Sequence, residues 1–182
     1  MAKESIMGIT IRKALLINAV KKVYPLVIFV AVFGLICYGV FYLLIVPKTP
    51  AAAEQVIAAL ISHGYEPQDI TEQYIAQNPD TARNLRQCVT AEKEDVHFEF
   101  YSFYNEKSAV NLYSTAFTLI IRTKMGTPNV EIDKKIANYC KYTLKASGTY
   151  SVAMYVGTTA VYAYSSAENW EKIDYIPKEI DY

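Results

Sequence analysis

The longest uninterrupted apolar stretch covers residues 25–46 and contains no charged residue and no Asn, Gln, Ser or Thr. As a helix, its 22 residues would span about 33 Å, which matches a bilayer hydrocarbon core of roughly 30 Å. Pro25 is tolerated in the first turn of a helix, and Pro47 follows directly after the run. A stretch that is apolar on every face is too long for a domain of this size to bury, so the pattern predicts one transmembrane helix.

After this run the hydrophobic pattern predicts a folded domain over residues 47–182. Apolar positions recur at helical spacing in a first helix, which Thr49 would cap and Gly64 would end. The following stretch, 65–84, is rich in Pro, Asn and Asp and is typical of a loop, with one helical turn near 69–76.

Alternation with a period of two then replaces the helical spacing. It predicts five strands, which cover 85–90, 96–103, 138–146, 149–156 and 159–164. The dipeptides Ser147-Gly148 and Gly157-Thr158 are suited to two-residue hairpin turns, so the last three strands should be antiparallel neighbours.

Two more helices are predicted between and after these strands. Asn105 would cap a long helix that ends before Gly126. Ser165, with a glutamate three residues later, resembles a capping box for a last helix. This helix would bury Trp170 and would break or bend at Pro177.

The order of these elements is helix, two strands, helix, three strands and helix. Strands that come in runs indicate an antiparallel sheet with segregated helices, whereas strict alternation would indicate a parallel one. We therefore predict an α+β fold, with an antiparallel sheet of about five strands and helices on one face.

The distribution of charge predicts the orientation of the membrane helix. The chain has 18 basic and 18 acidic residues, but residues 1–46 carry five basic side chains and one acidic one, so the remainder has a net charge of −4. Positive residues stay on the cytoplasmic side, so segment 1–24 is expected inside, 25–46 across the plasma membrane and 47–182 outside. Residues 5–20 are either an interfacial amphipathic helix or a frayed tail.

Two processing alternatives compete with an uncleaved anchor. A secretory signal peptide could be cut near Ala51–Ala53, but the apolar stretch is longer than such peptides use and Pro50 intervenes. A lipoprotein could be acylated at Cys37, but Ile36 stands where a small residue is needed. We therefore expect an anchor that is retained.

The residue types that catalyse reactions or bind metals are few and scattered. His63 and His97 are the only histidines, and no cysteine–histidine spacing is typical of a metal site. We predict no metal, no cofactor and no catalytic residue. Cys88 and Cys140 are the cysteines expected outside the cell, where a disulfide is permitted, but we expect them to remain unpaired.

Sixteen tyrosines are the most unusual feature of the composition. A large share of them falls on the last three predicted strands, where they either form an aromatic binding surface or pack as cross-strand pairs. These candidate surface residues are Tyr139, Tyr142, Tyr150, Tyr155, Tyr162 and Tyr164.

The domain resembles a group of small, uncharacterised proteins of Gram-positive bacteria that carry a membrane anchor or a lipoprotein signal. The similar segments are 98–103 with the following helix, 138–142 with 148–150, and 155–157 with 161–163. The resemblance implies an anchored α+β domain and brings no activity with it. The chain departs from the group at Pro177, where the last helix usually continues.

We therefore expect a single-pass membrane protein with a non-catalytic binding or accessory domain at the cell envelope. Its partners would be the bilayer and another envelope protein or a glycan, while zero net charge gives no reason to expect nucleic acid. The alternatives are an envelope hydrolase that uses carboxylates such as Glu99 and Asp133, and a small subunit of a membrane complex.

Overall fold

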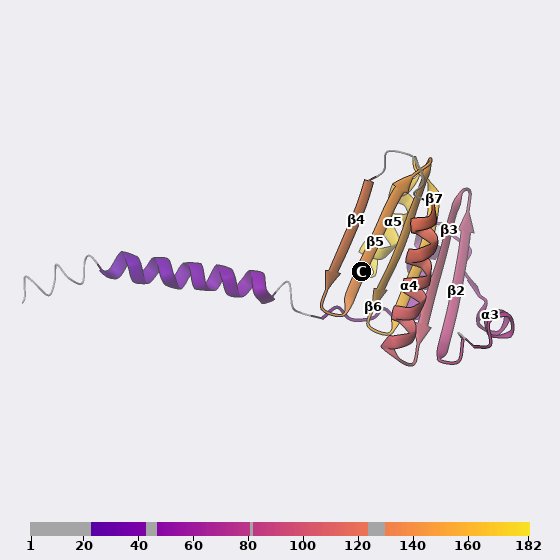
Figure 1. Cartoon of the computed structure of the whole chain (residues 1–182), viewed down its shortest axis with the longest axis horizontal. Helices are drawn as coiled ribbons and strands as arrows, with labels where there is room; N and C mark the ends of the chain where they lie inside the picture. Colours follow the sequence, from indigo (N-terminus) through magenta and orange to yellow (C-terminus); the bar gives the residue numbers. More distant parts are fainter. Residues whose placement is uncertain (1–22, 43–46, 81, 124–129) are drawn as a thin grey trace, which may run out of the picture. The chain divides into compact units, whose positions relative to one another are not determined.

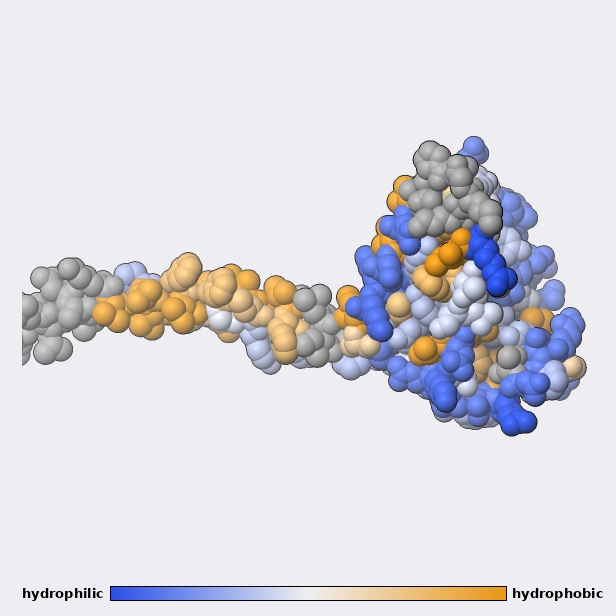
Figure 2. Space-filling view, in the orientation of Figure 1, coloured by the Kyte–Doolittle hydropathy of each residue, from blue (hydrophilic) through white to orange (hydrophobic). Residues whose placement is uncertain are grey.

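The computed structural model describes residues 23–42, 47–80, 82–123 and 130–182. The chain divides into two compact units, residues 1–46 and 47–182. In the first unit, Val23–Tyr42 is an apolar helix of 20 residues, long enough to cross a membrane, and a signal sequence would share these properties. Figure 2 shows apolar side chains along this helix. The expected segment 5–20 and residues 43–46 lie outside the described ranges.

The second unit contains four helices and seven strands among its described residues. The helices are α2 (Ala53–Ser62), α3 (Thr71–Gln77), α4 (Glu106–Arg122) and α5 (Trp170–Glu179). The strands are β1 (Gln68–Asp69), β2 (Leu85–Lys93), β3 (Val96–Phe103), β4 (Val130–Ile136), β5 (Tyr139–Ala146), β6 (Thr149–Val156) and β7 (Thr159–Ser166).

The strands form one antiparallel sheet in the order β1-β2-β3-β7-β6-β5-β4. Helix α4 carries the chain from β3 to the far edge, and the meander β4 to β7 returns until β7 pairs with β3 (Figure 1). Ser147 and Gly148 both have positive φ in the β5–β6 turn, as a two-residue hairpin turn requires. The predicted α+β class and antiparallel pairing are confirmed.

The sheet has two strands more than the five we predicted. The two-residue strand β1 extends the β2 edge, and β4 forms the opposite edge. In β4, apolar Val130 and Ile132 alternate with charged residues, and six of its seven residues are exposed. The alternation ends at the consecutive Lys134 and Lys135, so the period-two pattern of β4 is short.

Helices cover both faces of the sheet, so the expectation of helices on one face was wrong. Helices α2 and α5 pack on one face, called the α5 face, against residues such as Phe98, Phe100 and Val152. Helix α4 packs on the other, called the α4 face, against residues such as Tyr101 and Tyr142. Figure 1 shows α4 in front of the sheet and α5 behind it. The physical reason is that β6 is apolar on both faces and needs cover on both.

Helix ends agree with the prediction at two places. The amide of Gly64, with a φ of 75°, donates to Ile61 and that of Tyr65 donates to Leu60, a Schellman arrangement. The side chain of Asn105 accepts from the amide of Ser108, so it caps α4 as expected. Residues 124–129, where the end of this helix was predicted, lie outside the described ranges.

The predicted start of the first helix and the predicted break of the last helix at Pro177 were wrong. Helix α2 begins at Ala53, three residues after Pro50, and the amide of Ala52 donates to the side chain of Gln55. Helix α5 continues through Pro177 to Glu179. Pro177 is buried beside Ile176, which belongs to the core of the α5 face, so packing offsets the cost of its missing amide donor.

The expected capping box at Ser165 was also wrong, because β7 continues through Ser166. Asp95, in the β2–β3 turn, binds the backbone at this point instead of a capping box. Its carboxylate accepts from the amide of Ser166 at 2.8 Å and from the side chain of Asn169 at 2.7 Å. Hydrogen bonds from the side chain and the amide of Ser166, and then from Asn169, lower the pKa of Asp95 to about 2.

A clamp joins the first and last residues of the folded unit. The amide of Lys48 donates to the side chain of Asn138, which donates back to the carbonyl of Lys48. The buried hydroxyl of Tyr182, the last residue, accepts from the amide of Ala51 at 3.0 Å and contacts the hydroxyl of Thr159. Segment 48–51 is thereby fixed to the sheet.

Candidate functional site

The six candidate tyrosines do not form one surface. Side chains alternate between faces along a strand, so Tyr139 and Tyr150 lie on the α5 face and the other four on the α4 face. Four of the six are buried, namely Tyr139, Tyr142, Tyr150 and Tyr155, whereas Tyr164 is 38% exposed. Most of these rings therefore serve packing, including edge-to-face pairs with aromatic residues of α4.

The two cysteines of the folded unit are free thiols, and the sheet holds them apart. They share one row of the α4 face, but Cys88 on β2 and Cys140 on β5 are separated by three intervening strands. Four strand spacings amount to about 19 Å, far beyond the 7 Å limit for the Cα atoms of a disulfide. Burial raises the pKa of Cys88 to about 12, so this thiol is not an activated nucleophile.

The carboxylates named for a hydrolase are equally far apart. Glu99 on β3 and Asp133 on β4 occupy the two ends of another row of the α4 face. Their separation is again four strand spacings, about 19 Å, whereas paired glycosidase carboxylates lie roughly 5–10 Å apart. These two side chains therefore cannot act on one glycosidic bond.

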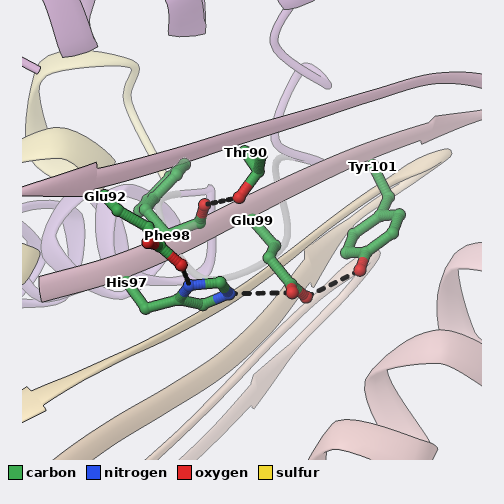
Figure 3. A network of polar contacts seen from close by, with 6 residues as sticks. All are labelled: Thr90, Glu92, His97, Phe98, Glu99 and Tyr101. Atoms are coloured by element: carbon green, nitrogen blue, oxygen red, sulfur yellow. Dashed lines mark hydrogen bonds and ion pairs between the residues drawn. The ribbon is translucent and has the colours of Figure 1, made fainter. Parts of the chain in front are cut away.

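His97 is the centre of a polar network along β3 (Figure 3). Its Nδ1 lies 2.8 Å from a carboxylate oxygen of Glu92, and its Nε2 lies 2.8 Å from one of Glu99. The hydroxyl of Tyr101 donates to the second oxygen of Glu99 at 2.6 Å. An imidazole can donate from both nitrogens only when it is doubly protonated. The network thus suits a positively charged His97. Its polar atoms bind one another, so the network has a structural role.

This network predicts that stability decreases as the pH rises above the usual pKa of histidine. The hydrogen bond to Glu99 raises the pKa of His97 above its usual 6.5, burial opposes this, and Glu92 adds to the rise. The stabilisation is therefore complete below pH 6.5 and is lost as the pH rises through the folded-state pKa. Urea unfolding from about pH 5 to about pH 9 should show this decline, and His97→Gln should remove it. An equal decline in both proteins would contradict the prediction.

His63 lies elsewhere, at the end of α2, and its Nε2 is 2.8 Å from a carboxylate oxygen of Glu179 on α5. Its ring also stacks on Tyr175 with a centroid separation of 6.0 Å. Within the described ranges, no group of three or more His, Cys, Asp or Glu side chains is placed to hold a metal ion.

The candidate site is a groove of about 300 Å³ on the α5 face, between the β4 edge and the start of α5. Cross-strand register explains its composition, because directly opposed residues share a face. Three such pairs of β4 and β5 contribute, and β6 and α5 complete the walls. The lining residues are Val130, Ile132, Lys134, Lys141, Thr143, Lys145, Tyr150, Trp170 and Asp174.

Positive charge dominates the groove. Lys134 and Lys141 are directly opposed on neighbouring strands, an arrangement of like charges that costs stability. Asp174 offsets one of them, since its carboxylate lies 2.7 Å from Nζ of Lys141 and 3.3 Å from Nζ of Lys178. Burial alone would raise the pKa of Asp174, but these lysines lower it overall. Lys134 and Lys145 remain exposed.

The apolar part of the groove is open to solvent. Trp170 is 37% exposed, so the expectation that it would be buried was wrong. Its indole and the ring of Tyr150 form an edge-to-face pair, with 6.1 Å between the ring centroids. Val130 and Ile132 are 62% and 46% exposed beside it. A groove with an aromatic wall, an apolar floor and cationic groups is suited to binding small molecules.

Sequence reasoning missed this site because β4 was not recognised. The alternation of Val130, Ile132 and Lys134 on one strand and of Lys141 and Lys145 on the next could have placed them on one face. The contribution of Trp170 could not have been inferred, since it depends on where α5 crosses the sheet.

Comparisons with known proteins add little to this geometry. No protein-family model matches the chain, and no curated protein matches it. A GTP-binding regulator from Thermotoga maritima is similar over 74% of this chain and 90% of its own, with 11% identity and a TM-score of 0.42. The extracellular domain of PknH from Mycobacterium tuberculosis is similar over 73% of this chain and 96% of its own, with 14% identity and a TM-score of 0.38. These likenesses are too distant to carry a functional argument.

Proposed function

We propose that this protein is a membrane-anchored binding protein whose folded unit lies outside the cytoplasm and acts by holding a small ligand in the groove beside Trp170. The observation that carries the proposal is the groove itself, in which exposed apolar side chains adjoin lysines that few acidic groups offset. Exposed apolar surface beside uncompensated charge lowers the stability of the folded state and is typical of a binding site.

The groove favours binding over catalysis. Of its nine lining residues, Asp174 is the one carboxylate, and it is held between Lys141 and Lys178. A general acid or base has to reach its substrate with a free proton site, whereas this side chain is committed to ion pairs.

The proposed location follows from charge and hydropathy. The apolar helix Val23–Tyr42 is long enough to span a bilayer, and the basic residues before it would stay in the cytoplasm. The resemblance to anchored proteins of Gram-positive bacteria supports the same arrangement. The groove would then meet ligands of the cell envelope or the medium.

Cysteine labelling of intact cells tests this location. In a Cys37→Ala background, exposed Lys107 on α4 is replaced by cysteine, while Cys88 and Cys140 remain buried. A membrane-impermeant maleimide should label Lys107→Cys in intact cells and should label Lys3→Cys only after permeabilisation. The reverse pattern would place the folded unit in the cytoplasm and contradict the proposal.

A further inference from the structure

Charge and apolar surface are separated along the groove. Lys134 and Lys141 form one end of it, and Lys145 lies four residues further along β5, about 13 Å away at the rise of a strand. Ile132 and Thr143 form the pair between them. A ligand in the groove therefore meets cationic groups at the ends and apolar surface in the middle.

The positive charge at the end formed by Lys134 and Lys141 is only partly compensated. Asp174 binds Lys141 and Lys178, but the directly opposed Lys134 has no ion pair among the described residues. Repulsion between Lys134 and Lys141 weakens the folded state. An anion placed between the two would remove that repulsion and gain charge-assisted hydrogen bonds.

The apolar part of the groove determines which kind of uncharged group the ligand can carry. The indole of Trp170 forms an edge-to-face pair with Tyr150 and is partly exposed, so its exposed surface can contact a flat ring. Val130 and Ile132 provide an apolar floor. The volume of about 300 Å³ is at the lower limit of small-molecule sites, which suits a ligand of one or two rings better than a long acyl chain.

A peptide that pairs with the open edge of β4 as an added strand is an alternative to a ligand in the groove. Four of the seven residues of β4 are charged, namely Glu131, Asp133, Lys134 and Lys135. Charged side chains on an edge strand oppose pairing with further strands. The charged residues therefore protect the edge of β4 against strand pairing, whereas the groove on the face of the sheet stays open to a ligand.

We infer that the groove binds a free small organic anion with a flat apolar body, such as an aryl carboxylate. The carboxylate lies between Lys134 and Lys141, and the ring lies over Ile132 against Trp170. This inference rests on the proposed binding function and specifies the ligand class of the same groove.

Trp170 is the single tryptophan of the chain, so tryptophan emission reports on the groove alone. The full chain, in a nonionic detergent, is titrated with 4-nitrobenzoate and with the neutral 4-nitrobenzyl alcohol, since both nitroarenes quench an indole on contact. We expect saturable quenching by both, with a Kd for the anion at least about fivefold lower.

Two lysines of β4 provide a matched pair of variants. Lys134→Gln removes the groove lysine and should bring the Kd for 4-nitrobenzoate close to that for the alcohol. Lys135→Gln removes the same charge from the next residue, which lies on the opposite face opposite Cys140, and should leave both Kd values unchanged.

The outcomes separate the two proposals. Equal Kd values for the anion and the alcohol, or an equal effect of both variants, would overturn the anion inference while leaving a binding groove. Quenching that does not saturate with either compound would overturn the groove as a binding site, and with it the proposed function.

Discussion

Replacement of Asp174 by asparagine is expected to lower the free energy of unfolding by about 2–4 kcal/mol, because it leaves the mostly buried ammonium of Lys141 without a counter-charge. The side chains of this pair are only 16% and 15% exposed, and their charged atoms lie 2.7 Å apart. Urea unfolding followed by far-ultraviolet circular dichroism of the full chain in detergent measures the change.

Glu171→Gln is the matched control, since Glu171 is an exposed acidic residue of the same helix and should change stability by less than about 0.5 kcal/mol. Combining Asp174→Asn with Lys141→Met should recover part of the loss, because the unpaired charge is removed. If Asp174→Asn were no more destabilising than the control, the ion pair would not be a stabilising element.

The second large effect is expected at the end of the chain. Tyr182→Ala should lower the free energy of unfolding by about 3–5 kcal/mol, because it removes a buried ring and the hydroxyl that holds segment 48–51. Tyr182→Phe isolates the hydroxyl and should cost about 1–3 kcal/mol, since the amide of Ala51 loses its acceptor. The same unfolding assay gives both values.

Asp181→Asn is the control for this pair of variants. Asp181 precedes Tyr182, its side chain is fully exposed, and its φ of 59° is one that asparagine adopts readily. Its substitution should change stability by less than about 0.5 kcal/mol. A similar loss for Tyr182→Phe and Asp181→Asn would show that the tail, and not the tyrosine hydroxyl, determines the effect.

Local patterns predicted the parts of this fold that local physics determines. The alternation in β3, the cap at Asn105 and the turn at Ser147-Gly148 depend on residues close in sequence, and all three are present. Each of them follows from side-chain period, hydrogen bonding or backbone conformation within a few residues.

The errors arose where distant residues decide the outcome. Ser165 looks like a helix cap in isolation, but pairing of β7 keeps it in a strand. Pro177 would end an isolated helix, yet packing on the sheet retains the last turn. The groove combines β4, β5, β6 and α5, so only the register of the sheet and the position of α5 bring its residues together.

The clamp between Ala51 and Tyr182 has a consequence for the order of folding. The contact joins residues 131 positions apart, whereas the hairpins of β5, β6 and β7 join neighbouring segments. Closing a long loop costs more conformational entropy than closing a short one. The hairpins are therefore expected to form early and the clamp late.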